Sequence, residues 1–229
     1  MAPKIDVYLE VGAKRTFAGA IEWQGWCRSG KDEAAALEAL FAYGPRFAKV
    51  LARSRLGFEA PARASALTVI ERVKGNATTD FGAPDVPPSI DAKPIRDADL
   101  RRFNAVLKAS WSALDAAERR AHGKKLATGP RGGGRDVVKI LEHVVGAEES
   151  YLRMIGGKLD EDERGDRDAE RKAVLKVLET TSRDGVPPSP RGGKRWTPRY
   201  FVRRSVWHVL DHAWELEDRT PGNAAGARA

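Results

Sequence analysis

Three histidines of this chain stand at spacings that suit a metal ion. His208 and His212 are four residues apart in a segment predicted to be helical, so both imidazoles lie on one helical face. His143 lies in another predicted helix, and its imidazole would complete a three-nitrogen site with an open coordination position. Because the chain has only 4 histidines, this placement favours a metal site. The alternative is that each histidine is hydrogen-bonded to a carboxylate.

Three imidazole ligands suit a divalent transition metal such as zinc, nickel, iron or cobalt. A purely structural zinc site is more often closed by cysteine ligands. Glu215 shares the face of the two helical histidines, at about −20° when His208 is set at zero and His212 lies at about 40°. We expect Glu215 to be a fourth ligand, a partner that orients an imidazole, or the catalytic general base.

A glycine-rich segment, Pro130–Arg135 (PRGGGR), directly precedes the helix that carries His143. Its backbone N–H groups, together with Arg131 and Arg135, are candidates to bind an anionic group of a cofactor or substrate. The segment lacks the Gly-Lys-Ser/Thr of a nucleotide-binding loop. A similar run, Pro190–Arg195 (PRGGKR), precedes the second histidine-bearing helix. The two runs indicate either related helical hairpins or ordinary turn chemistry.

Other reactive or aromatic side chains have plainer interpretations. Cys27 follows a tryptophan and precedes Arg28, so it is either a thiol activated by the arginine or a buried structural thiol. His122 is expected to face solvent at the end of a helix. Trp207 and Trp214 fall on one side of the last helix, where they either pack on the N-terminal part of the chain, as we expect, or line the mouth of a pocket.

The N-terminal third has the pattern of a small sheet with helices on one face. Lys4–Val11 and Arg15–Trp23 show partial alternation around a short glycine-containing turn, which predicts a hairpin. Asp32 is a good N-cap for a helix that ends at Gly44-Pro45, and Arg46–Arg55 continues as a second short helix. Ser65–Lys74 reads as a further strand.

The remainder of the chain is predicted to be helical. Residues 75–95 are rich in glycine and proline without apolar periodicity, and are interpreted as a linker or a covering loop. Four amphipathic segments follow, which predict a four-helix up-down bundle: Asp97–Ala121, Asp136–Ile155, Asp166–Ser182 and Pro198–Asp218. The predicted fold is therefore α+β, with a small α/β domain over 1–94, a bundle over 95–220 and a disordered tail over 221–229.

Composition limits the function classes. With 31% charged residues and no long apolar run, the 229-residue chain reads as a globular protein without a membrane span. Its N-terminus lacks the layout of a signal peptide, so we expect a cytoplasmic location. The net charge of +8 is dispersed among acidic residues and accompanies no recognition motif, which makes nucleic acid an unlikely partner.

The residues around the histidines resemble a known superfamily. LEHVVGAEESYLRMIGG around His143 and SVWHVLDHAWELEDR around His208 and His212 are similar to DinB-like proteins. This resemblance covers about half of the chain and implies a four-helix bundle with a metal held by one histidine of the second helix and a His-x-x-x-His pair of the fourth. Several DinB-like proteins resemble transferases or isomerases that use low-molecular-weight thiols such as mycothiol or bacillithiol, and many others have no known activity, so the resemblance implies either an enzyme of this kind or a protein without one.

A weaker resemblance concerns the N-terminal part. EWQGWCRSGKDEAAALEAL at Glu22–Leu40 is similar to the strand, loop and helix of HicB-like antitoxin domains, although Gln24 replaces the usual proline and Trp26 precedes the cysteine. The resemblance implies a small α/β module that binds a protein partner.

Two functions from different classes follow from these patterns. The first is a metal-dependent enzyme, a thiol-dependent S-transferase or a hydrolase, that acts on a small molecule. A second copy of the chain is a candidate partner, as a homodimer. The second is a non-enzymatic protein-binding or stress-response module, in which the helices are a scaffold.

Overall fold

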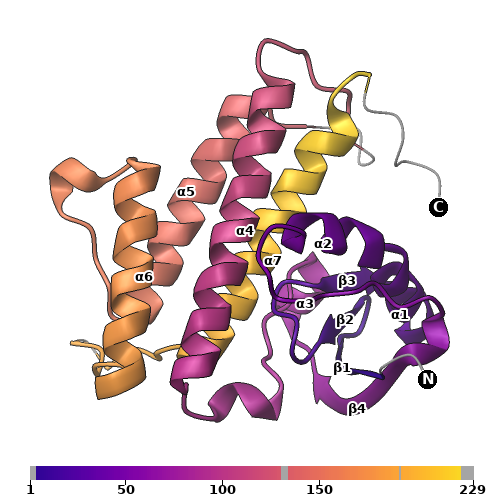
Figure 1. Ribbon diagram of the computed structural model, residues 1–229, viewed down its shortest axis with the longest axis horizontal. Coiled ribbons are helices and arrows are strands. Elements are labelled where there is room, and N and C mark those ends of the chain that lie inside the picture. The colour runs from indigo at the N-terminus through magenta and orange to yellow at the C-terminus, as the bar shows by residue number, and fades with distance from the viewer. Residues whose placement is uncertain (1–3, 130–133, 191, 223–229) are drawn as a thin grey trace.

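The computed structural model describes residues 4–129, 134–190 and 192–222. A four-stranded sheet with its helices is followed along the chain by long helices, so the predicted α+β class is confirmed. The two parts lie side by side, with the sheet next to one end of the long helices (Figure 1). The predicted disordered tail lies, from residue 223 onward, outside the described residues.

The sheet contains β1 (Ile5–Val11), β2 (Thr16–Ala20), β3 (Cys27–Gly30) and β4 (Leu67–Lys74) in the order β3-β2-β1-β4. The predicted hairpin is confirmed as the antiparallel pair β1 and β2, and the strand predicted near Ser65 is β4, which pairs in parallel with β1. The sequence did not predict β3, since its four residues are too few for an alternating pattern to be detected.

Both faces of the sheet are covered. Val7 and Leu9 belong to the same buried cluster as Leu40 of α1 (Glu33–Ala42), on one face. On the opposite face, Phe17 packs edge-to-face on Trp207, with ring centroids 6.0 Å apart. The expectation of helices on one face was therefore incomplete, because a helix from the C-terminal half covers the other.

Residues at the N-terminal ends of the two short N-terminal helices explain where these helices begin. The Asp32 side chain accepts a hydrogen bond from the Ala35 N–H and caps α1, as predicted. The next helix, α2 (Gly44–Leu51), starts before its predicted first residue because Pro45 occupies its first turn, where no backbone donor is needed.

Residues 75–95 form a covering segment. They include a short helix, α3 (Ala77–Phe81), and a 3₁₀ turn at Ser89–Ala92. Tyr200 donates to the Asp85 carbonyl, and Arg204 donates to the Pro84 carbonyl. Of the two predicted interpretations, linker and covering loop, these contacts favour the second.

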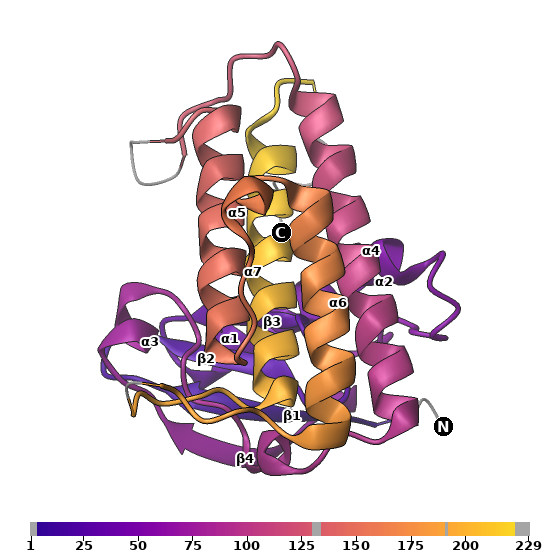
Figure 2. The same ribbon diagram turned by 90° about the vertical axis from the view of Figure 1, so that its left-hand side faces the viewer.

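The long helices closely match the predicted segments. They are α4 (Asp97–Ala121), α5 (Val137–Met154), α6 (Arg167–Asp184) and α7 (Pro198–Arg219). Figures 1 and 2 show the four helices side by side, and α7 contacts each of the other three. No helix in the described ranges is long and apolar enough to cross a bilayer.

One buried ion pair joins three parts of the chain. The Arg203 side chain is 5% exposed and its partner Asp91 1% exposed, with Nε–Oδ2 and Nη2–Oδ1 distances of 2.7 and 2.8 Å. The same guanidinium donates to the carbonyls of Ala20 and Ile21 at the end of β2. Arg203 therefore fastens α7 to the sheet and to the covering segment at one point.

A second buried polar group lies among α4, α5 and α6. Trp111 Nε1 donates to Glu148 Oε1 at 2.7 Å, and burial raises the pKa of Glu148 to about 7. Burial, together with the nearby charge of Glu148, raises the pKa of Glu170 to about 8. One buried oxygen of Glu170 has no partner among the described residues, so protonation of this pair lowers its cost of burial.

We expect Asp91→Ala to lower the free energy of unfolding by about 3–5 kcal/mol, because it leaves the buried Arg203 guanidinium without its counter-charge. Urea denaturation measures the effect. Arg72→Ala, which breaks an exposed pair with Glu33, serves as the control and should leave stability nearly unchanged. Equal effects of the two substitutions would contradict the central role of the buried pair.

The lowered pKa values of His143 and His208 make stability rise with pH below the ordinary histidine value of 6.5. We expect Glu148 and Glu170 to make an opposing contribution, which falls as the pH rises from about 4.5 to about 8, because their pKa values are raised above the ordinary 4.5. At these carboxyls the folded protein then binds more protons than the unfolded chain over that range, and each carboxyl lowers stability by ~1.4 kcal/mol per pH unit until its folded pKa is passed. Glu170→Gln should remove its share of this fall from the slope of stability against pH in urea unfolding curves. Glu179→Gln, an exposed change on the same helix, should keep the wild-type slope, and a Glu170→Gln slope equal to it would refute the assignment.

Candidate metal centre

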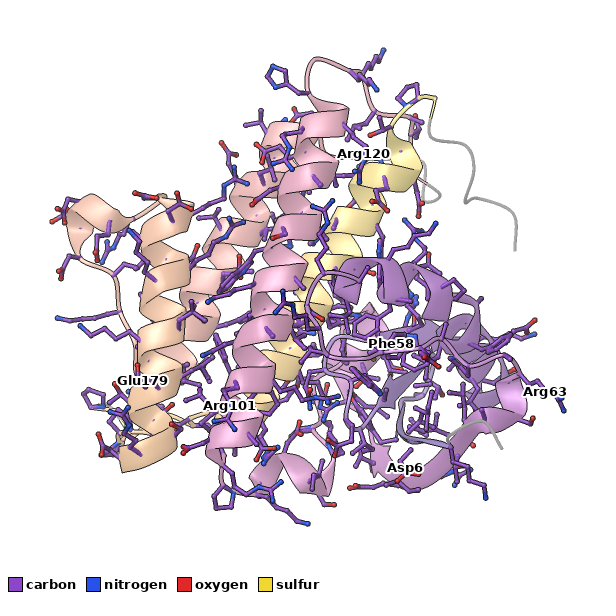
Figure 3. The ribbon with its side chains drawn as sticks, in the orientation of Figure 1. Asp6, Phe58, Arg63, Arg101, Arg120 and Glu179 are labelled. Carbon is purple, nitrogen blue, oxygen red and sulfur yellow. The ribbon has the colours of Figure 1, made fainter. Side chains whose placement is uncertain are left out.

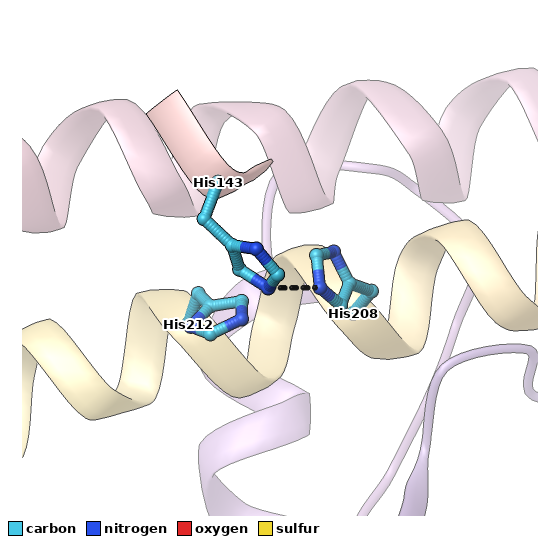
Figure 4. Close-up of side chains that lie close together, drawn as sticks. All are labelled: His143, His208 and His212. Atoms are coloured by element: carbon cyan, nitrogen blue, oxygen red, sulfur yellow. Dashed lines mark hydrogen bonds between the residues drawn. The ribbon is translucent and has the colours of Figure 1, made fainter. Parts of the chain in front are cut away.

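Three imidazoles meet between α5 and α7. His208 and His212 are one turn apart on α7, and His143 reaches them from α5 (Figure 4). Their candidate ligand atoms all lie within 4.8 Å of one another, and the Nε2 atoms of His143 and His208 are 3.2 Å apart. The structure therefore brings together all three histidines that the sequence nominated.

Local packing explains why His143 points inward. Ile140 and Val144, which flank it along α5, are fully buried, so this face of the helix lies against the protein interior. On α7, the 3.6-residue period aligns His208 with His212. The site thus depends on α5 and α7 being neighbours, which their packing provides.

The spacing of the nitrogen atoms fits a metal ion. Two imidazole nitrogens on a tetrahedral zinc, each at about 2.0–2.1 Å from the metal, are about 3.3 Å apart. The Nε2–Nε2 distance of 3.2 Å between His143 and His208 is close to this value. It also suits an N–H···N hydrogen bond between two neutral imidazoles, so geometry alone permits both interpretations.

The protonation states favour metal binding. Burial lowers the pKa of His208 well below its ordinary value, and the neighbouring charges of His212 and His143 act in the same direction. Burial also lowers the pKa of His143. Both imidazoles are therefore neutral near pH 7, as metal coordination requires.

The Glu215 carboxylate is hydrogen-bonded to the His212 imidazole. Its Oε2 is 2.8 Å from His212 Nδ1, and its Oε1 accepts a hydrogen bond of 2.6 Å from Arg219 Nη1. Burial raises the pKa of Glu215, but these hydrogen bonds outweigh burial and bring it below its ordinary value. Because both carboxylate oxygens have partners and Nδ1 of His212 is engaged, Nε2 remains for a metal. This geometry favours the orienting role of Glu215; its predicted catalytic role stays a prediction.

Arg135 lies close enough to the histidines to affect them electrostatically. Its positive charge contributes to lowering the pKa values of His143 and His208, and its carbonyl accepts a hydrogen bond from Arg219 Nη2. A Cβ at Gly134 would come within 2.1 Å of that nitrogen, so glycine permits this approach. Arg131, the other candidate for binding an anion, lies outside the described residues.

Arg219 and Tyr151 belong to the surroundings of the site and were not singled out from the sequence. Arg219 is 7% exposed and joins Glu215 to the carbonyls of Ala127 and Arg135. Its signal was the i,i+4 spacing from Glu215, which is typical of a helical ion pair. Tyr151 has its ring centroid 5.7 Å from that of His208, a contact between helices that spacing cannot reveal.

The Nδ1 atoms of His208 and His212 differ in their hydrogen bonding, since only that of His212 has a carboxylate partner. Nδ1 of His208 and Oγ of Ser205 are both buried without a hydrogen-bond partner in the described part of the chain. Metal-binding histidines usually donate this nitrogen to an oxygen atom. Ser205 lies three residues earlier on α7, at a spacing that places it on a neighbouring part of the same face.

The other nominated residues lie apart from the histidines. Cys27 is buried at the start of β3 beside Trp207, and burial raises its pKa to about 12. This environment favours the structural thiol over one activated by arginine. His122 is exposed after α4, as predicted. Trp214 packs on Tyr43 with ring centroids 5.1 Å apart, which confirms its predicted packing on the N-terminal part.

No protein-family model, curated protein or solved structure matches this chain. The DinB-like and HicB-like resemblances therefore stay predictions that depend on the motifs themselves.

We expect Glu215→Ala to weaken zinc binding about 10- to 100-fold, because it removes the carboxylate that orients His212. Competition with a chromogenic chelator measures the dissociation constant. Asp218 lies on the same helix as Glu215 and pairs with Arg46 of α2. Asp218→Ala removes this carboxylate and should leave zinc affinity unchanged. Unaltered affinity in Glu215→Ala would exclude the orienting role.

Proposed function

We propose that this chain is a metal-dependent enzyme that acts on a small molecule, with a divalent transition metal bound by His143, His208 and His212. The observation that carries the proposal is the convergence of three imidazoles whose nitrogen atoms lie within 4.8 Å of one another. The carboxylate on His212 Nδ1 is a common partner of a metal-bound imidazole and leaves Nε2 for the ion.

The proposal includes the arrangement of the helices. The four long helices form an up-down bundle over 95–220 that holds the site between its second and fourth members, as the DinB-like resemblance implies. The segment 1–94 is a separate α/β domain packed on the last helix. Metal sites inside bundles are commonly built in this way from side chains on facing helices.

The chain's own residues have distinct roles in this proposal. His143, His208 and His212 hold the ion, and Glu215 keeps the His212 ring in position. Arg135 supplies positive charge for an anionic group of the substrate. When bound, the metal supplies Lewis-acid chemistry that lowers the pKa of a water molecule or a low-molecular-weight thiol. Three protein ligands leave a position for that molecule, which favours a hydrolase or an S-transferase over a purely structural site.

Elemental analysis of protein purified without a histidine tag tests this function. We expect about one equivalent of a transition metal in the wild type, with loss in both His208→Ala and His212→Ala, because two imidazoles hold a metal far less tightly than three. Circular dichroism should show that most helical content remains. His122→Ala removes the exposed histidine and is the matched control.

Two outcomes would overturn the proposal. Equal metal content in the wild type and in both site variants would place any metal elsewhere. A wild-type protein that contains no metal and takes up none from zinc, nickel or iron solutions would support the non-enzymatic binding module instead. A metal-loaded wild type justifies screening low-molecular-weight thiols as co-substrates.

A further inference from the structure

Helix α4 carries a second stripe of small residues away from its core face. On a helical wheel with Ala105 at zero, the stripe spans about −20° to 80°, and it consists of Ala105, Ala109, Ser112, Ala113 and Ala116. The core residues of α4, such as Phe103 and Leu114, are centred at about 160°. Ala109 and Ala113 of this stripe are half-buried and pack against the core cluster, and α2 contacts α4, whereas Ser112 is exposed.

This stripe forms one wall of a groove of about 1100 Å³. Opposite it are residues from α2 and the turn that follows, among them Val50 and Ala52, while Trp214 lies at the end formed by α7. From Ala105 to Ala116 the stripe is about 16 Å long, the length of three helical turns. We refer to this groove as the α2–α4 groove; none of the three clustered histidines is among its lining residues.

The α2–α4 groove is rimmed by positive charge. Lys49, Arg53 and Lys108 line it and have no ion pair among the residues that the structure describes. The carboxylates in the groove are already paired, since Glu217 and Asp218 contact Arg46, and Glu217 also contacts Arg120. The groove therefore has a net positive rim over a floor of small side chains.

Basic residues also follow one edge of the stripe along α4, and Arg120, which is paired with Glu217, lies within its span near the C-terminal end. Arg101, Lys108 and Arg119 lie at about −60° to −40° on the wheel, and Arg120 lies at about 60°. Figure 3 shows Arg101 and Arg120 toward opposite ends of the helix. With Lys49 and Arg53 on the opposite wall of the groove, the small-residue floor has basic side chains on both sides, a pattern that suits a helix of opposite charge.

We propose that the α2–α4 groove binds an amphipathic helix of a partner protein, with small or apolar residues on its contacting face and Asp or Glu along its flanks. Small side chains on the floor let the two helix axes approach closely. The lysines and arginines of the rim pair with the flanking carboxylates and set the register. About 11 residues of the partner, three helical turns, match the length of the stripe.

Charge disfavours the other occupants available. In a dimer formed through the same groove, the basic edges of two identical α4 helices would face each other, and like charges oppose such pairing. Residues 221–229 of this chain contain an arginine and no Asp or Glu, so they lack the carboxylate flanks that the rim requires. An acidic helix from another protein is the occupant that the charges favour.

The test uses a fluorescein-labelled peptide of about 14 residues, with an alanine and leucine seam flanked by glutamates, and the full-length protein. Fluorescence anisotropy should show binding that weakens with added salt. The double variant Lys49→Glu/Lys108→Glu should raise the dissociation constant at least about tenfold. Ser112→Trp, which fills the groove from an exposed position, should abolish binding.

Two controls separate the groove from general attraction to a basic protein. Lys172→Glu/Lys176→Glu makes the same charge change on exposed positions of α6 and should retain wild-type affinity. A peptide with lysines in place of the glutamates should not bind. The proposal is overturned if the α6 variant loses as much affinity as the groove variant, if Ser112→Trp binds normally, or if light scattering shows a dimer that Ser112→Trp dissociates.

Discussion

The structure depends on the burial of the N-terminal half of α7, where residues 199–210 are all buried, and on the Arg203–Asp91 pair inside it. A helix enclosed by protein cannot leave a guanidinium unpaired, because the cost of desolvation exceeds what packing returns. Arg203 therefore bonds to a carboxylate of the covering segment and to two carbonyls at the end of β2. Through these bonds one side chain sets both the position of α7 against the sheet and its rotation about its own axis.

That rotation determines what each face of α7 does. The face with Trp207 and Trp214 packs on the N-terminal unit, through Phe17 and Tyr43. The face with His208 and His212 turns toward α5, where His143 completes the cluster. Because a helix advances about 100° per residue, the three-histidine cluster can form only while the other faces stay packed. The N-terminal unit thus supports the site indirectly, by fixing the helix that carries it.

Polar groups in the interior fall into two kinds. Arg203 and Arg219 are buried and bonded to carboxylates and carbonyls, so they connect segments that are distant in sequence. His208, Ser205 and Glu170 each have a buried atom without a partner among the described residues, which costs free energy unless something compensates for it. At Glu170 a proton provides that compensation, because burial raises its pKa to about 8. The α2–α4 groove has a separate feature at the surface: Lys49, Arg53 and Lys108 line it and have no ion pair among the described residues.

The sequence by itself determined the elements whose patterns repeat. The long helices could be predicted nearly to the residue, because apolar positions at helical spacing recur over 18 to 25 residues. The i,i+4 relation of His208 and His212 and the nearness of Glu215 follow from the same period. Tertiary structure alone decided that four-residue β3 is a strand, that α7 covers the sheet, and that His143 reaches His208. These outcomes depend on contacts between residues far apart in the chain, and local periodicity carries no information about which faces will meet.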